Sequence, residues 1–161
     1  MSEIDRIADQ IASGYRDGAW PGVSVRDVLR SLSASEAAAH PVASCHSAWE
    51  IALHISFWHD AVRRRLGGDP VDYRDDEDWP APAEPTAANW RAALDRMDTV
   101  HQTLVDTVRA LDPEALERHS PGKSFTVYFM LHGVPQHDLY HGGQVVLLKK
   151  VSRSTSLPRS C

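Results

Sequence analysis

Two histidines four residues apart, His137 and His141, are the residues whose types and spacing most directly suggest chemistry. On an α-helix, side chains four positions apart lie one above the other on the same face. Two imidazoles stacked in this way can direct nitrogen atoms at one point and share a metal ion. The pair therefore predicts a metal site, and the alternative is two histidines whose hydrogen bonds are satisfied in the core or at the surface.

A third histidine can join this pair from an earlier helix. Residues 46–66 repeat apolar side chains at helical spacing, and His54 lies in the middle of the apolar face. Three inward imidazoles with no fourth protein ligand are typical of a catalytic metal centre, which keeps one position open. The predicted ligands are therefore His54, His137 and His141. They suit zinc, nickel, iron or copper, and we favour zinc or nickel, with iron as an alternative.

Glu50 is the candidate catalytic residue, because it precedes His54 by one helical turn. Its carboxylate could orient a ligand imidazole or act as a base on metal-bound water. The alternative is a carboxylate near the start of a helix, where the helix dipole stabilises negative charge. Both roles remain open for Glu50.

The other polar residues near these positions are given structural roles. We expect Asp138 to hydrogen-bond an adjacent helix or a ligand histidine. A di-iron centre is rejected, because the further inward carboxylates that it requires are missing. The remaining histidines are expected at the surface or in loops, with His101 the one that could face inward; they are His40, His59, His101, His119 and His132.

Four long helices must position these side chains. Hydrophobic residues recur at intervals of three and four over residues 3–17, 46–66, 87–111 and 125–151. Pro135 lies inside the last segment and should kink the helix or mark a fresh start. Joined antiparallel, these segments predict an all-α four-helix bundle over residues 1–151 with long connections. A C-terminal tail, residues 152–161, is expected to be disordered.

The connections between the long helices carry further signals. A turn is predicted at residues 20–22, and a capping box at Ser33 and Glu36 predicts a short helix over residues 34–39. The linker over residues 67–85 is acidic and rich in proline, so we expect a solvated loop that could form a rim over a pocket. Trp79 within it is expected to pack back onto the bundle. The arginine run at residues 63–65 is expected to be a solvated helix end.

Composition narrows the range of partners and locations. A chain of 161 residues favours one domain, and its net charge of -5 gives no indication of a nucleic-acid partner. No apolar run approaches the roughly 20 residues of a membrane span. The start of the chain lacks the plan of a signal peptide, and two cysteines are no disulfide framework. We therefore expect a cytoplasmic protein that acts on a small molecule.

Two blocks of the sequence resemble the DinB-like superfamily of bacterial helical bundles. They are residues 47–55 (SAWEIALHI) and residues 136–145 (QHDLYHGGQV). The second block is the more specific, and the resemblance extends over nearly the whole chain.

The resemblance implies a four-helix bundle in which one histidine of the second long helix and two residues of the fourth bind a divalent metal. On this chain those positions are His54, His137 and His141. Many members form dimers, and characterised relatives include S-transferases and isomerases that use mycothiol, bacillithiol or glutathione-type thiols. The implied function is a metal-dependent thiol S-transferase acting on a small electrophile, with a low-molecular-weight thiol as cosubstrate. A metal-dependent hydrolase and a non-catalytic, stress-associated bundle with a structural metal are the alternatives.

Overall fold

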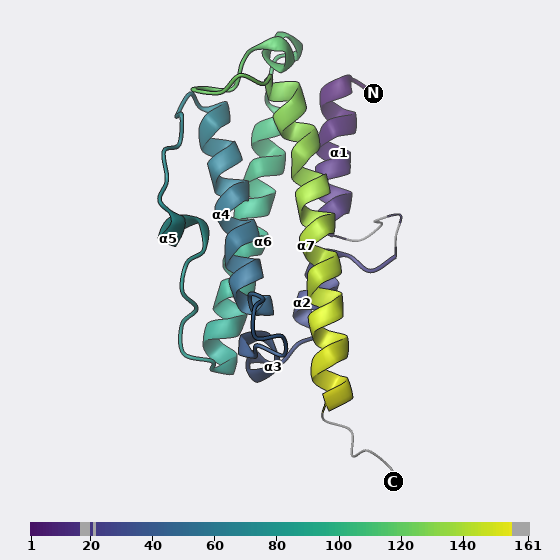
Figure 1. Ribbon diagram of the computed structural model, residues 1–161. Coiled ribbons are helices and arrows are strands. Elements are labelled where there is room, and N and C mark those ends of the chain that lie inside the picture. The colour runs from purple at the N-terminus through teal and green to yellow at the C-terminus, as the bar shows by residue number, and fades with distance from the viewer. Residues whose placement is uncertain (17–19, 21, 156–161) are drawn as a thin grey trace.

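The computed structural model describes residues 1–16, 20 and 22–155 (Figure 1). The four long helices are α1 (Glu3–Tyr15), α4 (Ala48–Leu66), α6 (Ala87–Arg109) and α7 (Val127–Thr155). Shorter elements lie between them: α2 (Val25–Arg30), α3 (Ala34–Ala38), α5 (Asp75–Asp78) and the 3-10 helix η1 (Pro113–Glu117). Over the described residues every named element is helical, so the prediction of an all-α four-helix bundle is confirmed.

Hydroxyl side chains determine where the long helices begin. Ser2 and Ser47 each form a capping box, in which the hydroxyl accepts from the backbone N–H three residues later. Without a capping box, Thr86 caps α6 by accepting from the backbone N–H of Asn89, and Thr126 accepts from the backbone N–H of Phe129 at the start of α7. The predicted capping box at Ser33 is confirmed and begins α3.

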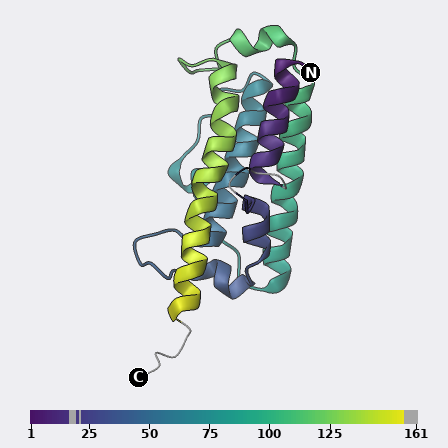
Figure 2. The same ribbon diagram turned by 90° about the vertical axis from the view of Figure 1, so that its right-hand side faces the viewer.

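The long helices form a ring in which α1 contacts α6 and α7, and α4 also contacts α6 and α7. Helices α1 and α7 run in one direction, and α4 and α6 run in the other (Figures 1 and 2). The expectation that consecutive helices are joined antiparallel is therefore wrong for α4 and α6, which are parallel neighbours. Residues 67–86 cross the whole bundle between them, past the short helix α5.

The length of this crossover explains the parallel pair. A helix of 19 residues such as α4 is about 28 Å long. An extended chain covers roughly 3.3 Å per residue, so the connection is more than long enough to return to the starting end of α4. Hydrophobic spacing alone does not reveal that return.

Helix α7 is continuous through Pro135, so the alternative of a fresh start after Gly133 is wrong. A Cβ on Gly14 would lie 3.1 Å from the Pro135 Cβ, which shows how closely α1 approaches α7 there. The helix also runs through Thr155, beyond the expected end near residue 151. The remainder of the predicted tail and part of the predicted turn at residues 20–22 lie outside the described residues.

The core consists of two apolar clusters separated by a buried polar layer. His59 of α4, His101 of α6 and Asp138 of α7 form this layer, next to the ring of Tyr15. One cluster includes Ile4, Ile7, Ile11, Val62, Leu104, Val108, Leu131 and Val134, and the other includes Val25, Leu29, Trp49, Ile55, Trp90, Met97 and Val145. Polar groups thus lie at the middle of the bundle.

Two adjacent glycines of α7 provide a test of this packing. A Cβ on Gly142 would lie 2.9 Å from Val25 Cγ2, whereas a Cβ on Gly143 would meet open space. We expect Gly142→Ala to lower the free energy of unfolding by about 1 kcal/mol through overpacking. Gly143→Ala should raise it by up to about 1 kcal/mol, because alanine favours a helix. Urea unfolding of both variants measures the difference, and equal effects would contradict the close approach of α2 to α7.

Candidate metal centre

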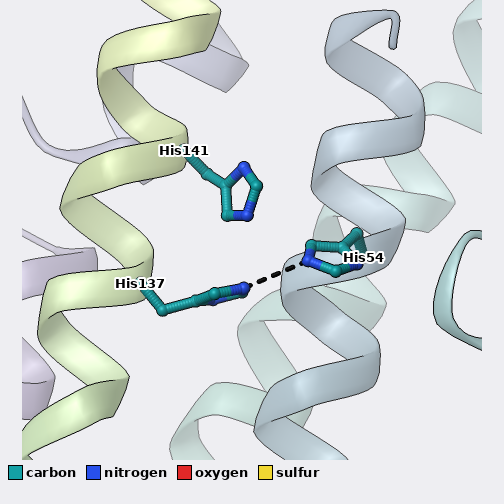
Figure 3. A group of neighbouring side chains, drawn as sticks. All are labelled: His54, His137 and His141. Carbon is teal, nitrogen blue, oxygen red and sulfur yellow. Dashed lines mark hydrogen bonds between the residues drawn. The ribbon is translucent and has the colours of Figure 1, made fainter.

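His54 of α4 and the pair His137 and His141 of α7 face one another across the contact between these helices (Figure 3). One ring nitrogen from each lies within 4.8 Å of the others. The Nε2 atoms of His54 and His137 are 3.1 Å apart, and the His141 ring lies 4.8 Å from that of His54. The structure therefore brings together all three histidines that the sequence singles out.

Neighbouring oxygens orient two of these rings. The Nδ1 of His54 donates to the backbone oxygen of Asp78 at 2.9 Å and lies equally close to the Asp78 carboxylate. The Nδ1 of His141 donates to Gln144 Oε1 at 2.6 Å. With both Nδ1 protons engaged, the Nε2 lone pairs are left for the cluster. Hydrogen bonds of this kind are typical of imidazoles that bind a metal.

Burial keeps the three imidazoles in the neutral form that a metal requires. Desolvation lowers the pKa of His54 and of His141 below the ordinary value. It lowers the pKa of His137 to about 3, and the neighbouring His141 and His54 lower it further. The cluster is therefore neutral at neutral pH, and within it the Nε2 atoms of His54 and His137 hydrogen-bond each other (Figure 3).

The donor set fits a divalent cation. Two nitrogens bonded to one tetrahedral ion at about 2.1 Å lie roughly 3.4 Å from each other, near the observed 3.1 Å between His54 and His137. The group contains three imidazoles and, within the described part of the chain, no fourth histidine, cysteine or carboxylate. The histidines can thus hold an ion and leave room for another ligand.

A pocket of about 670 Å³ opens beside the cluster, and we call it the histidine pocket. Its walls come from α4, α7, the loop before α4 and the crossover. They include Val42, Cys45, His46, His54, Trp58, Asp78, Trp79, His137, Tyr140, His141, Gln144 and Leu147. A volume of this size suits a small organic molecule.

The crossover contributes directly to this pocket. The ring of Trp79 stacks on His54 at 3.8 Å and, on its other face, on His46 at 3.7 Å. Asp78 also accepts a hydrogen bond from the indole of Trp58 at 2.7 Å. The expectations that Trp79 packs back onto the bundle and that the linker forms a rim are confirmed.

Glu50 is held at the start of α4. Its carboxylate accepts from the backbone N–H of Ser47 at 2.7 Å and lies 2.9 Å from His40 Nε2. Burial raises the pKa of Glu50, but these hydrogen bonds outweigh that effect and lower it overall. None of its contacts within the described residues is with the three histidines, and it is absent from the walls of the histidine pocket. A catalytic role for Glu50 therefore stays a prediction.

A second cluster, in the buried polar layer, was missed by the sequence reasoning. His59 and His101 are 1% and 0% exposed, so the expectation of a surface position is wrong for His59, and the inward alternative holds for His101. His59 donates to Asp138 at 2.8 Å, which confirms that Asp138 hydrogen-bonds an adjacent helix. Asp138 Oδ1 also lies 4.0 Å from His137 Nδ1, so this carboxylate joins the two clusters.

His101 is the least satisfied member of this second cluster. Its ring packs against Tyr15 with centroids 4.2 Å apart and the planes tilted by 32°, and neither ring nitrogen has a hydrogen-bond partner in the described structure. Burial lowers the pKa of His101 to about 2, and His59 and Arg16 lower it further. The donors of His59, His101 and Asp138 lie within 4.8 Å of one another and could also hold an ion. The feature of the sequence that indicates the burial of His101 is its position inside the apolar stripe of α6.

Comparison with known proteins agrees with this geometry. A family model described as the DinB superfamily matches residues 23–145, more than half of the chain. The match contains all three clustered histidines and both sequence blocks that carry the resemblance. No curated protein and no solved structure shows a significant match. Separately, no described helix combines the length and apolar character needed to cross a membrane.

The buried His101 predicts a dependence of stability on pH. The folded state leaves this ring neutral, whereas in the unfolded chain it takes up a proton below about pH 6.5. The free energy of unfolding should therefore fall by about 1.4 kcal/mol for each pH unit below that value through this residue. His101→Phe keeps an aromatic ring beside Tyr15 and should reduce the slope by that amount.

Urea unfolding between about pH 6.5 and pH 4.5 measures the slope. His119→Phe, a change at an exposed histidine, is the control and should leave the slope as it is. An identical slope in wild type and His101→Phe would show that His101 is protonated in the folded protein.

Proposed function

The chain belongs to the DinB superfamily, and we propose that it is a divalent-metal-dependent enzyme that transfers a thiol sulfur to a small electrophile. The supporting observation is the position of His54, His137 and His141 on the wall of the histidine pocket. A closed structural site would have a fourth protein ligand in this group. An open site beside a pocket provides room for a substrate.

We assign His54, His137 and His141 as the ligands of the ion, with zinc or nickel favoured over iron. When bound, such an ion lowers the pKa of a thiol in its open position, so that the sulfur is a thiolate near neutral pH. Asp78 and Gln144 keep the Nε2 atoms of His54 and His141 aimed at the cluster. The stacked ring of Trp79 covers one face of His54 and excludes water there.

The reaction itself is a substitution. The thiolate sulfur forms a bond to an electrophilic carbon, and the leaving group departs with the electrons of the bond that breaks. The proton of the thiol passes to solvent through the open pocket. Apolar residues such as Leu147 and Val42 in its wall suit the carbon skeleton of a cosubstrate or substrate.

The remaining parts of the proposal concern partners and location. We propose a small-molecule substrate, a homodimer and a cytoplasmic location. Sedimentation at several protein concentrations tests the dimer.

Metal content and turnover of the untagged protein test the function. We expect about one equivalent of a divalent metal per chain and thiol-dependent conversion of a chloronitrobenzene, assayed with a panel of low-molecular-weight thiols. His54→Ala should lose both, because the cluster loses one of three ligands. His119→Ala, a change at an exposed histidine, should keep both. Unchanged turnover in His54→Ala would contradict the proposed function.

Other outcomes separate the alternatives. Ester hydrolysis that requires the metal and is independent of thiol would identify a hydrolase. A metal that stabilises the fold but admits no added ligand would identify a structural site.

Asp78 gives a sharper prediction about the proposed metal site. Asp78→Ala removes the carboxylate beside His54 Nδ1 and should weaken metal affinity by about tenfold to a hundredfold. Asp76→Ala is the matched control, because Asp76 is exposed and its side chain pairs with Arg74. Competition with a metal-binding dye measures both affinities. Equal affinities in the two variants would exclude a role for the Asp78 carboxylate, since the backbone oxygen that accepts from His54 is present in both.

A further inference from the structure

The arginine run at the end of α4 divides into a half-buried residue, Arg63, an exposed one, Arg64, and a buried one, Arg65. Arg63 pairs with Asp60 at 2.8 Å, and Arg64 pairs with Asp69 at 2.6 Å. Arg65 is only 4% exposed, so the expectation of a solvated run is wrong at this position. Its side chain shows no ion pair or hydrogen bond within the described residues, and its Nε is buried without a partner.

A buried guanidinium without a counter-ion is unusual. Arginine stays protonated even where burial lowers its pKa, as it does for Arg65. Folded proteins normally pair a buried charge, because an unpaired one loses its hydration without compensation. The guanidinium carbon of Arg65 lies over the face of the Trp58 ring, 5.4 Å from its centroid. This contact leaves the buried Nε–H without an acceptor among the described residues.

Arg65 lines a second cavity, of about 260 Å³, which we call the arginine pocket. Its other walls are almost entirely apolar and include Val62, Phe125, Phe129 and Met130. Arg65 is the one side chain in this lining that carries a full charge at neutral pH irrespective of its surroundings, and the lining contains no carboxylate. The cavity therefore combines an apolar interior with one unpaired cation.

The arginine pocket adjoins the proposed metal site. Trp58 and His137 line both this cavity and the histidine pocket. The Trp58 ring lies 5.4 Å from the guanidinium carbon of Arg65 and 6.3 Å from the His137 ring, and all three residues line the arginine pocket. A molecule bound at Arg65 would therefore extend toward His137.

We propose that the arginine pocket binds the electrophilic substrate, and that this substrate has an apolar body and one carboxylate that pairs with Arg65. The reactive end of the molecule lies toward His137. Assignment of the ligand as a substrate rests on the proposed function, whereas the binding site itself does not.

The chemistry of the pocket favours a carboxylate. The planar guanidinium can donate two parallel hydrogen bonds to one carboxylate. Surrounding apolar side chains lower the local dielectric constant and strengthen that attraction. The volume is slightly below the roughly 300–1,000 Å³ of typical ligand pockets, so the body of the molecule is about the size of one aromatic ring.

Equilibrium binding of phenylacetate and of its neutral analogue phenylacetamide tests this inference. Calorimetry on the protein as purified, with and without added zinc, should show the acid binding about tenfold or more tightly than the amide. Arg65→Met replaces the guanidinium with an uncharged, apolar side chain that is also unbranched, and it should abolish this preference for the acid. Arg64→Met, at the exposed neighbour paired with Asp69, should preserve it.

Two further variants distinguish binding in the cavity from binding elsewhere. A Cβ on Gly133 would meet open space, and Gly133 lines the arginine pocket, so Gly133→Leu should fill the cavity and block phenylacetate. Gly143→Leu is the matched control, because Gly143 also has open space but lies outside this lining. Equal binding in both variants would overturn the assignment of the pocket.

Thermal stability separates a ligand site from a structural role. Arg65→Met removes a buried charge that has no partner, so its melting temperature should equal or exceed that of wild type. A lower melting temperature, together with no preference for the acid in wild type, would make Arg65 a structural residue.

The binding assay contains no thiol, so its outcome does not depend on whether the protein catalyses the proposed thiol transfer. Carboxylate binding without thiol transfer would contradict only the proposed function. Transfer to neutral and anionic electrophiles at equal rates would contradict only the role of Arg65.

Discussion

Removal of imidazole rings from water is the constraint on which the centre of this bundle depends. Burial lowers the pKa of His54, His137, His141 and His101, so each ring is neutral at neutral pH. A neutral imidazole in a dry environment still needs partners for its nitrogens. Oxygens from Asp78 and other neighbours satisfy one nitrogen of several rings. The nitrogens that remain are available for a metal.

The connectivity of the bundle supplies these partners. Because α4 and α6 are parallel, the chain must return along the outside of the bundle between them (Figure 1). That return places Asp78 against His54 and Trp79 between His54 and His46. An antiparallel connection would be short and would not pass this side of the bundle. The surroundings of the candidate metal ligands are therefore a consequence of the parallel connection between α4 and α6.

Periodicity in the sequence was sufficient to predict the helices and the three clustered histidines. His54, His137 and His141 each lie in a stripe of apolar residues, so their direction follows from the helical repeat. The parallel crossover, the burial of His59 and the burial of Arg65 were not predicted. Each depends on which neighbour covers a helix face, and hydrophobic spacing does not specify that neighbour. Arg65 in particular has the same type and local sequence as its two less buried neighbours.

The separation of the histidines along the chain sets an order of events during synthesis. His54 and His137 are 83 residues apart, and the segment between them includes the crossover and α6. At roughly 5–20 residues per second, α4 leaves the ribosome several seconds before α7 has been made. The three-histidine site therefore cannot form on a nascent chain that lacks its last helix. Any metal must be acquired after translation is nearly complete, and prematurely terminated chains would expose the apolar face of α4 while remaining metal-free.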